Sequence, residues 1–138
     1  MSPEQVLGDP LELDIRRDVY ALGLILYQFL AGRPPYQVSS YLPEAIQTIR
    51  EKDAPRLSSI SGGYRGDIET IAAKALEKDK GRRYASAAAM AEDIRRYQNN
   101  EPIMARAPST AYQLRKFARR HRALMAGAAV VLVLNCIN

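Results

Sequence analysis

The chain has 138 residues, about the size of one ordinary domain, so a multi-domain enzyme is excluded. Its 47% hydrophobic and 25% charged residues exclude a collagen-like or wholly disordered protein, and its single cysteine and single histidine exclude a disulfide scaffold and a zinc finger. The formal net charge of +5 is unevenly placed, because residues 1–101 hold 14 Lys and Arg against all 15 Asp and Glu, whereas residues 102–138 hold cations and no acid. The sequence therefore describes a nearly neutral body with a basic tail.

The first strong helical segment is residues 18–31, DVYALGLILYQFLA, which is apolar on nearly every side. A helix of this kind is typical of the middle of a core. Gly32 can adopt the left-handed conformation that ends a helix, and Pro34 and Pro35 forbid its continuation. At this length the segment is too short to cross a bilayer.

Two further helices are expected before residue 80. Pro43 opens a helix that extends to about residue 52, with Ile46 and Ile49 on a narrow apolar side that predicts a surface position. A loop rich in Pro, Ser and Gly follows, and Asp67 is a plausible N-cap for the next helix. That helix carries one apolar stripe made of Ile68, Ile71, Ala72, Ala75 and Leu76.

Ser86 is expected to cap a fourth helix that packs on the core from the surface. Its adjacent acids resemble a solvated face far more than a pair of carboxylates for acid and base catalysis. The inner side is expected to hold Met90, Ile94 and Tyr97, and the outer side Glu92, Asp93, Arg95 and Arg96.

Residues 99–108 indicate an extended connector, after which Ser109 caps a last helix that passes through the basic cluster to the apolar stretch LMAGAAVVLVL. This stretch predicts the start of a membrane span that is short or cut off, and the basic flank places the preceding body in the cytoplasm. Two alternatives are a buried C-terminal helix with a solvated basic face, and a nucleic-acid patch. The second is disfavoured because no aromatic or Gly-rich pattern accompanies the charges.

The residues alone assemble no catalytic constellation. His121 lies between arginines beside the apolar stretch, which fits an interfacial cation better than a general base. The glycines form no phosphate-binding pattern, and no alternating strand pattern of useful length occurs. The body is therefore predicted to be all-α.

Several short motifs carry more information in their order than singly. The chain opens with MSPEQ, continues with Asp18 and the pattern DVYALG, ends the first helix with GRPPY, and later contains LEKDKGRRY. In this order the motifs resemble the C-terminal lobe of bacterial Hanks-type serine/threonine protein kinases, from the APE-like end of the activation segment onward. The segment ARAPSTAYQLRKFARRHRAL resembles the part that joins the kinase domain to the membrane helix in membrane-anchored members.

The resemblance implies structural roles for three residues. The glutamate of the APE-like motif, here Glu4, would pair with Arg83 and fasten the end of the activation segment to the helical core. Asp18 would accept hydrogen bonds from the catalytic-loop backbone. Alternatively, Asp18 is a simple N-cap of its own helix, and Glu4 and Arg83 are two exposed side chains that contribute little.

The resemblance also shows what the 138 residues do not contain. The glycine-rich loop, the strand lysine, and the HRD and DFG motifs of a kinase are missing, so no catalytic, cofactor-binding or metal-binding residue carries over. We therefore expect this chain alone to bind no ATP and to have no kinase activity, although the complete parent kinase uses ATP and Mg²⁺. A fragment, a split gene or a wrongly assigned start would explain the pattern.

The predicted organisation has three parts: residues 1–100 as a partial kinase domain, residues 101–122 as a basic juxtamembrane helix, and residues 123–138 as a truncated transmembrane segment. The expected function is that of a fragment of a Ser/Thr kinase, single-pass in the bacterial cytoplasmic membrane with its kinase part facing the cytoplasm. Expected partners are the missing N-terminal part of the kinase, protein substrates and the membrane, with no nucleic acid. The alternative is a non-catalytic, membrane-tethered module that binds kinases or their substrates through the helix from Pro43 and an exposed groove.

Overall fold

The computed structural model describes residues 15–37 and 40–136, with side chains up to residue 133. Within these ranges the chain is helical and contains no strand, which confirms the predicted all-α class. Short 3-10 turns η1 (Leu57–Ser59), η2 (Gly62–Tyr64) and η3 (Lys80–Arg82) connect the longer helices. These longer helices are α2 (Ile15–Ala31), α3 (Leu42–Glu51), α4 (Asp67–Ala75), α5 (Ala87–Gln98), α6 (Thr110–Arg120) and α7 (Arg122–Cys136).

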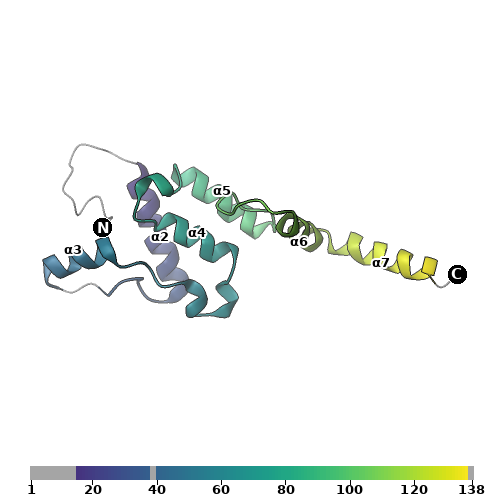
Figure 1. Ribbon diagram of the computed structural model, residues 1–138, viewed down its shortest axis with the longest axis horizontal. Helices are drawn as coiled ribbons and strands as arrows, with labels where there is room; N and C mark the ends of the chain where they lie inside the picture. Colours follow the sequence, from purple (N-terminus) through teal and green to yellow (C-terminus); the bar gives the residue numbers. More distant parts are fainter. Residues whose placement is uncertain (1–14, 38–39, 137–138) are drawn as a thin grey trace.

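Helices α2, α4 and α5 contact one another and form the body, while α3 lies at one end and α6 and α7 extend from the other (Figure 1). The core consists of two clusters, and α2 and α4 contribute residues to both of them. The first cluster is Val19, Ile71, Ala75, Tyr84, Met90 and Ile103, and the second is Tyr20, Tyr27, Leu57, Ala72 and Leu76. The apolar stripe predicted for α4 is confirmed, since all five of its residues are buried.

The predicted end of α2 is confirmed. Gly32 has a φ of 70° and its N–H donates to the carbonyl of Gln28 at 2.9 Å, which closes the helix in the left-handed conformation. The described part of α2 begins at Ile15, so Asp18 lies inside the helix and the expectation that it caps the helix is wrong.

The prediction that α2 lies in the middle of a core is only partly correct. Val19, Tyr20 and Tyr27 are at most 2% exposed, but Ile25 and Phe29 on another side of the helix are 65% and 85% exposed. The apolar residues on all sides of α2 therefore exceed what α4 and α5 cover. The pattern of apolar residues along a helix shows which of its sides are apolar, but it does not show whether another element packs against each side.

Gly23 allows α2 and α4 to approach closely. A Cβ atom built there would lie 2.8 Å from the Cβ of Ala75 and 3.2 Å from its carbonyl carbon, and backbone atoms cannot yield cheaply. We expect Gly23→Ala to lower the free energy of unfolding by about 1–3 kcal/mol, because overpacking outweighs the higher helix propensity of alanine. Urea unfolding of the two proteins measures this.

A matched control is Gly127→Ala, because a Cβ at Gly127 of α7 meets nothing within 4 Å. At this position the substitution changes only the helix propensity, which is higher for alanine than for glycine. Helix content should therefore rise slightly, and the unfolding free energy of the body should not fall. Equal destabilisation by the two substitutions would contradict the close contact assigned to Gly23.

Helix α5 begins as predicted, with the Ser86 side chain accepting a hydrogen bond from the N–H of Ala89 at 3.1 Å. Its predicted faces are partly wrong. Met90 is buried, whereas Tyr97, expected inside, is 39% exposed, and Asp93, expected in solvent, is 0% exposed.

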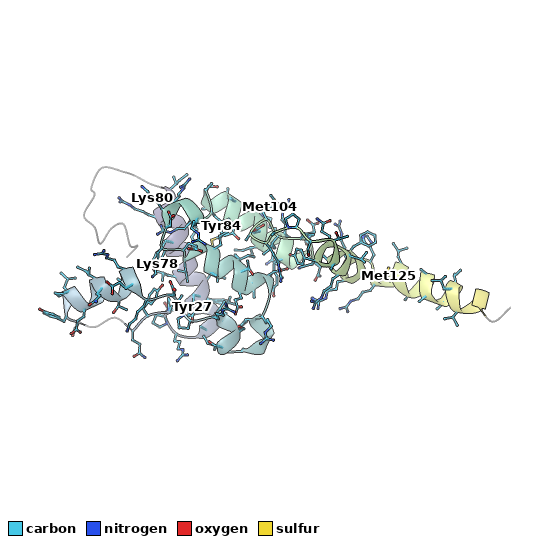
Figure 2. The ribbon with its side chains drawn as sticks, in the orientation of Figure 1. Tyr27, Lys78, Lys80, Tyr84, Met104 and Met125 are labelled. Carbon is cyan, nitrogen blue, oxygen red and sulfur yellow. The ribbon has the colours of Figure 1, made fainter. Side chains whose placement is uncertain are left out.

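The last helix was predicted to be continuous, but it is divided. Ser109 caps α6 as expected, accepting from the N–H of Tyr112. Helix α6 ends at Arg120, because the φ of −112° and ψ of 42° at His121 leave the helical region. Helix α7 then starts at Arg122 and extends away from the body, and Figure 2 labels Met125 near its start. Among the described residues, no helix has the length and apolar character needed for a membrane crossing.

The alternative of a buried C-terminal helix is wrong for the part of α7 whose side chains are described, because all of these side chains are exposed. Its large apolar side chains are between 47% and 68% exposed, with the extremes at Met125 and Leu124.

Candidate functional site

Arg83 lies at the junction between the start of α2 and the turn that follows α4, and it is 4% exposed. Its Nε donates to the carbonyl of Glu77 at 2.6 Å, while Nη1 and Nη2 donate to the carbonyls of Arg16 and Lys78, each at 3.2 Å. The guanidinium also lies 4.8 Å from the centre of the Tyr20 ring. A planar five-donor cation is suited to this arrangement, in which one side chain joins two segments far apart in sequence.

The structure answers part of what was expected of the three predicted structural residues. Arg83 is buried, so the alternative of an exposed arginine is wrong for it. Glu4 lies outside the described residues, and its pairing with Arg83 therefore stays a prediction. Asp18 is exposed on α2, and its hydrogen bonds to a catalytic loop also stay a prediction.

Lys78 fastens α3 to the body, and Figure 2 labels it where α3 meets the body. Its Nζ donates to the hydroxyl of Tyr36 and to the carbonyl of Ile49, both at 2.7 Å, and lies 4.3 Å from the Tyr36 ring. Burial lowers the pKa of the Lys78 amine, although the carboxylate of Asp53 opposes this effect. No role was predicted for Lys78, because its partners are far away in sequence.

Asp93 corrects the prediction of a solvated acidic pair with Glu92. Its Oδ2 accepts from the hydroxyl of Tyr84 and from the N–H of Ala105, both at 2.8 Å, and its Oδ1 accepts from the N–H of Met104 at 2.6 Å. Figure 2 shows Tyr84 in the body and Met104 on the connector after α5. Burial, followed by the hydrogen bond to Asp93, raises the pKa of Tyr84. The carboxylate therefore ties the connector to the core.

A second carboxylate, Asp67, holds α6 against the body. Gly66, with a φ of 116°, is the N-cap of α4, so the prediction that Asp67 caps this helix is wrong. The Asp67 side chain instead pairs with Lys116 at 2.5 Å and Arg106 at 3.2 Å, and accepts from the hydroxyl of Tyr112 at 3.0 Å. We call these four residues the Asp67 clamp. Lys116, expected in a solvated or interfacial cluster, is buried.

The Asp67 clamp borders a cleft of about 490 Å³ between α6, the end of α5 and the loop before α4. The cations on its wall exceed the one carboxylate, and that carboxylate already accepts from several donors. The cleft is therefore electropositive. Its lining includes Arg65, Arg106, Arg115, Lys116, Arg119, Tyr97 and Tyr112.

The clamp predicts sensitivity to acid. Burial alone would raise the pKa of Asp67, but the hydrogen bonds from Lys116 and Tyr112 and the charge of Lys116 outweigh it and lower the pKa below its ordinary value of 3.8. A lowered carboxyl pKa stabilises the fold fully above pH 3.8, and this contribution is lost as the pH falls through the lower folded-state pKa. Asp67→Asn should therefore cost stability at pH 6 and cost progressively less below about pH 3.8.

Unfolding free energies from urea titrations at neutral and acid pH measure this dependence. Glu44→Gln on α3 is a suitable control, because Glu44 is exposed. A difference between wild type and Asp67→Asn that is constant from pH 6 to pH 2 would contradict the ionised clamp.

An apolar groove of about 400 Å³ runs between α2 and α5. Its walls are made of Leu22, Ile25, Leu26, Phe29, Ala87, Met90, Ala91 and Ile94. This groove contains the exposed side of α2, where a core helix would be expected to have a neighbour.

The comparisons with known proteins agree on one family. Over 102 residues, the chain is 41% identical to the serine/threonine-protein kinase PknB of Mycobacterium tuberculosis. The aligned residues make up 74% of this chain and 16% of that protein. By sequence, the chain is a relative of PknB-type bacterial serine/threonine kinases. A probable PknB of Bifidobacterium longum is 37% identical over 99 residues, covering 72% of this chain and 14% of that protein. No family model matches the chain.

The relationship to PknB-type kinases confirms the predicted resemblance, and the helical body is consistent with the C-terminal lobe of a kinase. The chain spans about a sixth of the length of these curated relatives. Within the part that the structure describes, no group of three or more His, Cys, Asp or Glu side chains is arranged to hold a metal ion. The buried polar groups described above join segments of the fold that are far apart in sequence.

Proposed function

We propose that this chain is the C-terminal-lobe part of a membrane-anchored bacterial serine/threonine kinase, whose parent reaction transfers the γ-phosphoryl group of ATP to protein Ser or Thr. The identity of 41% over 102 residues carries the proposal. The buried Arg83 supports it, since three carbonyls orient its guanidinium at the position where the resemblance to kinases pairs this residue with Glu4.

In this proposal residues 1–100 form the partial kinase domain, and residues 101–122 form the juxtamembrane part. Residues 123–138 begin the membrane anchor, with the kinase part in the cytoplasm. The basic residues of α6 and the exposed apolar side chains of α7 support this division. The proposed partners are the remainder of the kinase domain, which would supply the ATP and Mg²⁺ site, protein substrates, and the membrane.

The 138 residues alone should neither bind ATP nor transfer phosphate, because phosphoryl transfer depends on groups that position ATP and Mg²⁺ and on a catalytic base. Those groups reside in the glycine-rich loop and in the HRD and DFG motifs, which this sequence does not contain. Incubation of the purified chain with radiolabelled ATP, Mg²⁺ and a generic protein substrate checks this. Transfer of label above the level of a heat-denatured sample would contradict it.

A chimera tests the relationship directly. The aligned segment of Mycobacterium tuberculosis PknB is replaced by the matching residues of this chain, and autophosphorylation is measured. We expect the chimera to be active, and we expect Arg83→Ala to abolish its activity while Arg82→Ala preserves it. A soluble, ATP-binding chimera without activity would count against the proposed role, as would a chimera that does not fold.

A non-catalytic interaction module is the second candidate, because the groove between α2 and α5 exposes an apolar surface. The gene sequence upstream of codon 1 distinguishes the two candidates. An in-frame extension with HRD and DFG motifs favours the kinase, whereas a stop codon followed by a promoter favours the module.

A further inference from the structure

Helix α6 presents an apolar side to solvent. Leu114 and Phe117 are 66% and 55% exposed, and side chains three residues apart lie on the same side of a helix. Four residues after Phe117, the ring of His121 packs against it with centres 4.6 Å apart, which extends this side to the end of the helix. We call Leu114 and Phe117 the outer pair.

The opposite side of α6 is fixed to the body. Tyr112 and Lys116 are four residues apart and both reach Asp67, at 3.0 Å and 2.5 Å. Because Lys116 and Asp67 are both buried, these contacts determine which side of α6 remains outside. The exposure of the outer pair is therefore a property of the docked fold rather than of a loosely attached tail.

The rest of the surface of α6 is basic. Arg115 and Arg119 border the electropositive cleft on the clamped side of the helix, and Arg120 lies toward one flank of the outer pair, 3.3 Å from Glu101. No acid follows Glu101 in the sequence. An apolar stripe on a helix whose remaining surface is rich in cations is typical of a helix that lies in the plane of an anionic lipid surface, where each Lys or Arg strengthens binding by roughly fivefold.

The apolar surface continues into α7. Only His121 separates the two helices, and the side chains of Leu124 and Met125 in the first turns of α7 are 68% and 47% exposed. The outer pair alone falls far short of the roughly 800 Å² per partner that a stable interface between two copies of the chain buries. The concentrated positive charge would also repel a second copy.

We propose that α6 is an interfacial helix, which lies along the surface of an anionic lipid bilayer with the outer pair among the lipid chains and with the body clamped to its other side. The inference rests on the membrane anchoring proposed for α7 and deepens it. The Asp67 clamp then fixes the orientation of the kinase-like body relative to the bilayer, so the body does not swing freely on a flexible linker.

The experiment uses tryptophan as a probe of depth, because the sequence contains no tryptophan and its two phenylalanines, Phe29 and Phe117, are both exposed. Three single variants of the full chain are compared: Phe117→Trp on α6, Leu132→Trp on α7 and Phe29→Trp on α2. Each is mixed with vesicles of phosphatidylglycerol and brominated phosphatidylcholine, and both cosedimentation and tryptophan quenching are measured. Circular dichroism verifies that the variants fold equally.

We expect Phe117→Trp and Leu132→Trp to be quenched several times more strongly than Phe29→Trp, with emission shifted to shorter wavelength. Quenching of Leu132→Trp alone would overturn the interfacial role of α6 and leave the anchor intact. A chain that does not cosediment would overturn the anchor and the interfacial helix together. A wavelength shift that grows with protein concentration without quenching by brominated lipid would mean that a second copy covers the outer pair, and would also overturn the proposal.

Discussion

Asp93→Ala is expected to lower the free energy of unfolding by about 3–5 kcal/mol, because it leaves three donors of the core without their acceptor. The carboxylate is fully buried and accepts from Tyr84, Met104 and Ala105 at 2.6–2.8 Å. Removing it strands two backbone N–H groups and a hydroxyl away from water. A loss of this size is a large share of the total stability of a small domain.

The adjacent residue is a matched control. Glu92 is also an acid on α5, but its side chain is 50% exposed and it pairs with Arg95 and Arg96 at 3.3 Å and 3.5 Å in solvent. Glu92→Ala should therefore cost less than about 1 kcal/mol. Urea unfolding followed by circular dichroism measures both variants, and equal losses would show that Asp93 does not hold the connector.

Arg83→Ala should also cost about 3–5 kcal/mol. It removes three hydrogen bonds to the carbonyls of Glu77, Lys78 and Arg16, and the packing of the guanidinium on Tyr20. Arg83→Lys should recover only part of the loss, because one ammonium cannot reproduce a planar fork that reaches three acceptors. Thermal and urea unfolding of both variants test this order.

Arg82 provides the corresponding control. Its side chain is 71% exposed and makes one ion pair, with Glu77 at 3.5 Å. Arg82→Ala is expected to change stability by less than about 1 kcal/mol. If Arg82→Ala and Arg83→Ala destabilise the chain to the same extent, the buried arginine does not join α2 to the turn after α4.

In each of these two pairs, one of two adjacent residues with the same charge is exposed and the other is buried. The sequence indicates the buried residue better in one pair than in the other. Asp93 could have been found, because it lies three residues after Met90 and so falls on the buried side of a helix with a period of 3.6 residues. Asp93 was nevertheless predicted to lie in solvent, because acidic side chains are usually exposed. For Arg83 the resemblance to kinases supplied the warning, since nothing in the local pattern separates it from Arg82.

The Asp67 clamp could not be predicted from the chain. Its cations are 39 or more residues from Asp67, and the Lys116 side chain is indistinguishable by pattern from the arginines around it. Only the tertiary fold, which places α6 within side-chain reach of the first residue of α4, brings these groups together. A short polar residue before an apolar stripe predicts an N-cap, which is why Asp67 was expected to cap α4. In the structure its side chain binds donors from distant parts of the chain instead.

The amino-acid sequence by itself determined the helical class, the end of α2 at Gly32, the caps at Ser86 and Ser109, the buried stripe of α4 and the kinship with bacterial kinases. These features depend on contacts within one or two helical turns, or on motif order. The tertiary structure alone decided which sides of α2 and α6 are covered, and which charged residues are buried. Burial depends on the elements that pack nearby, and a charge is tolerated inside only where distant donors or acceptors meet it.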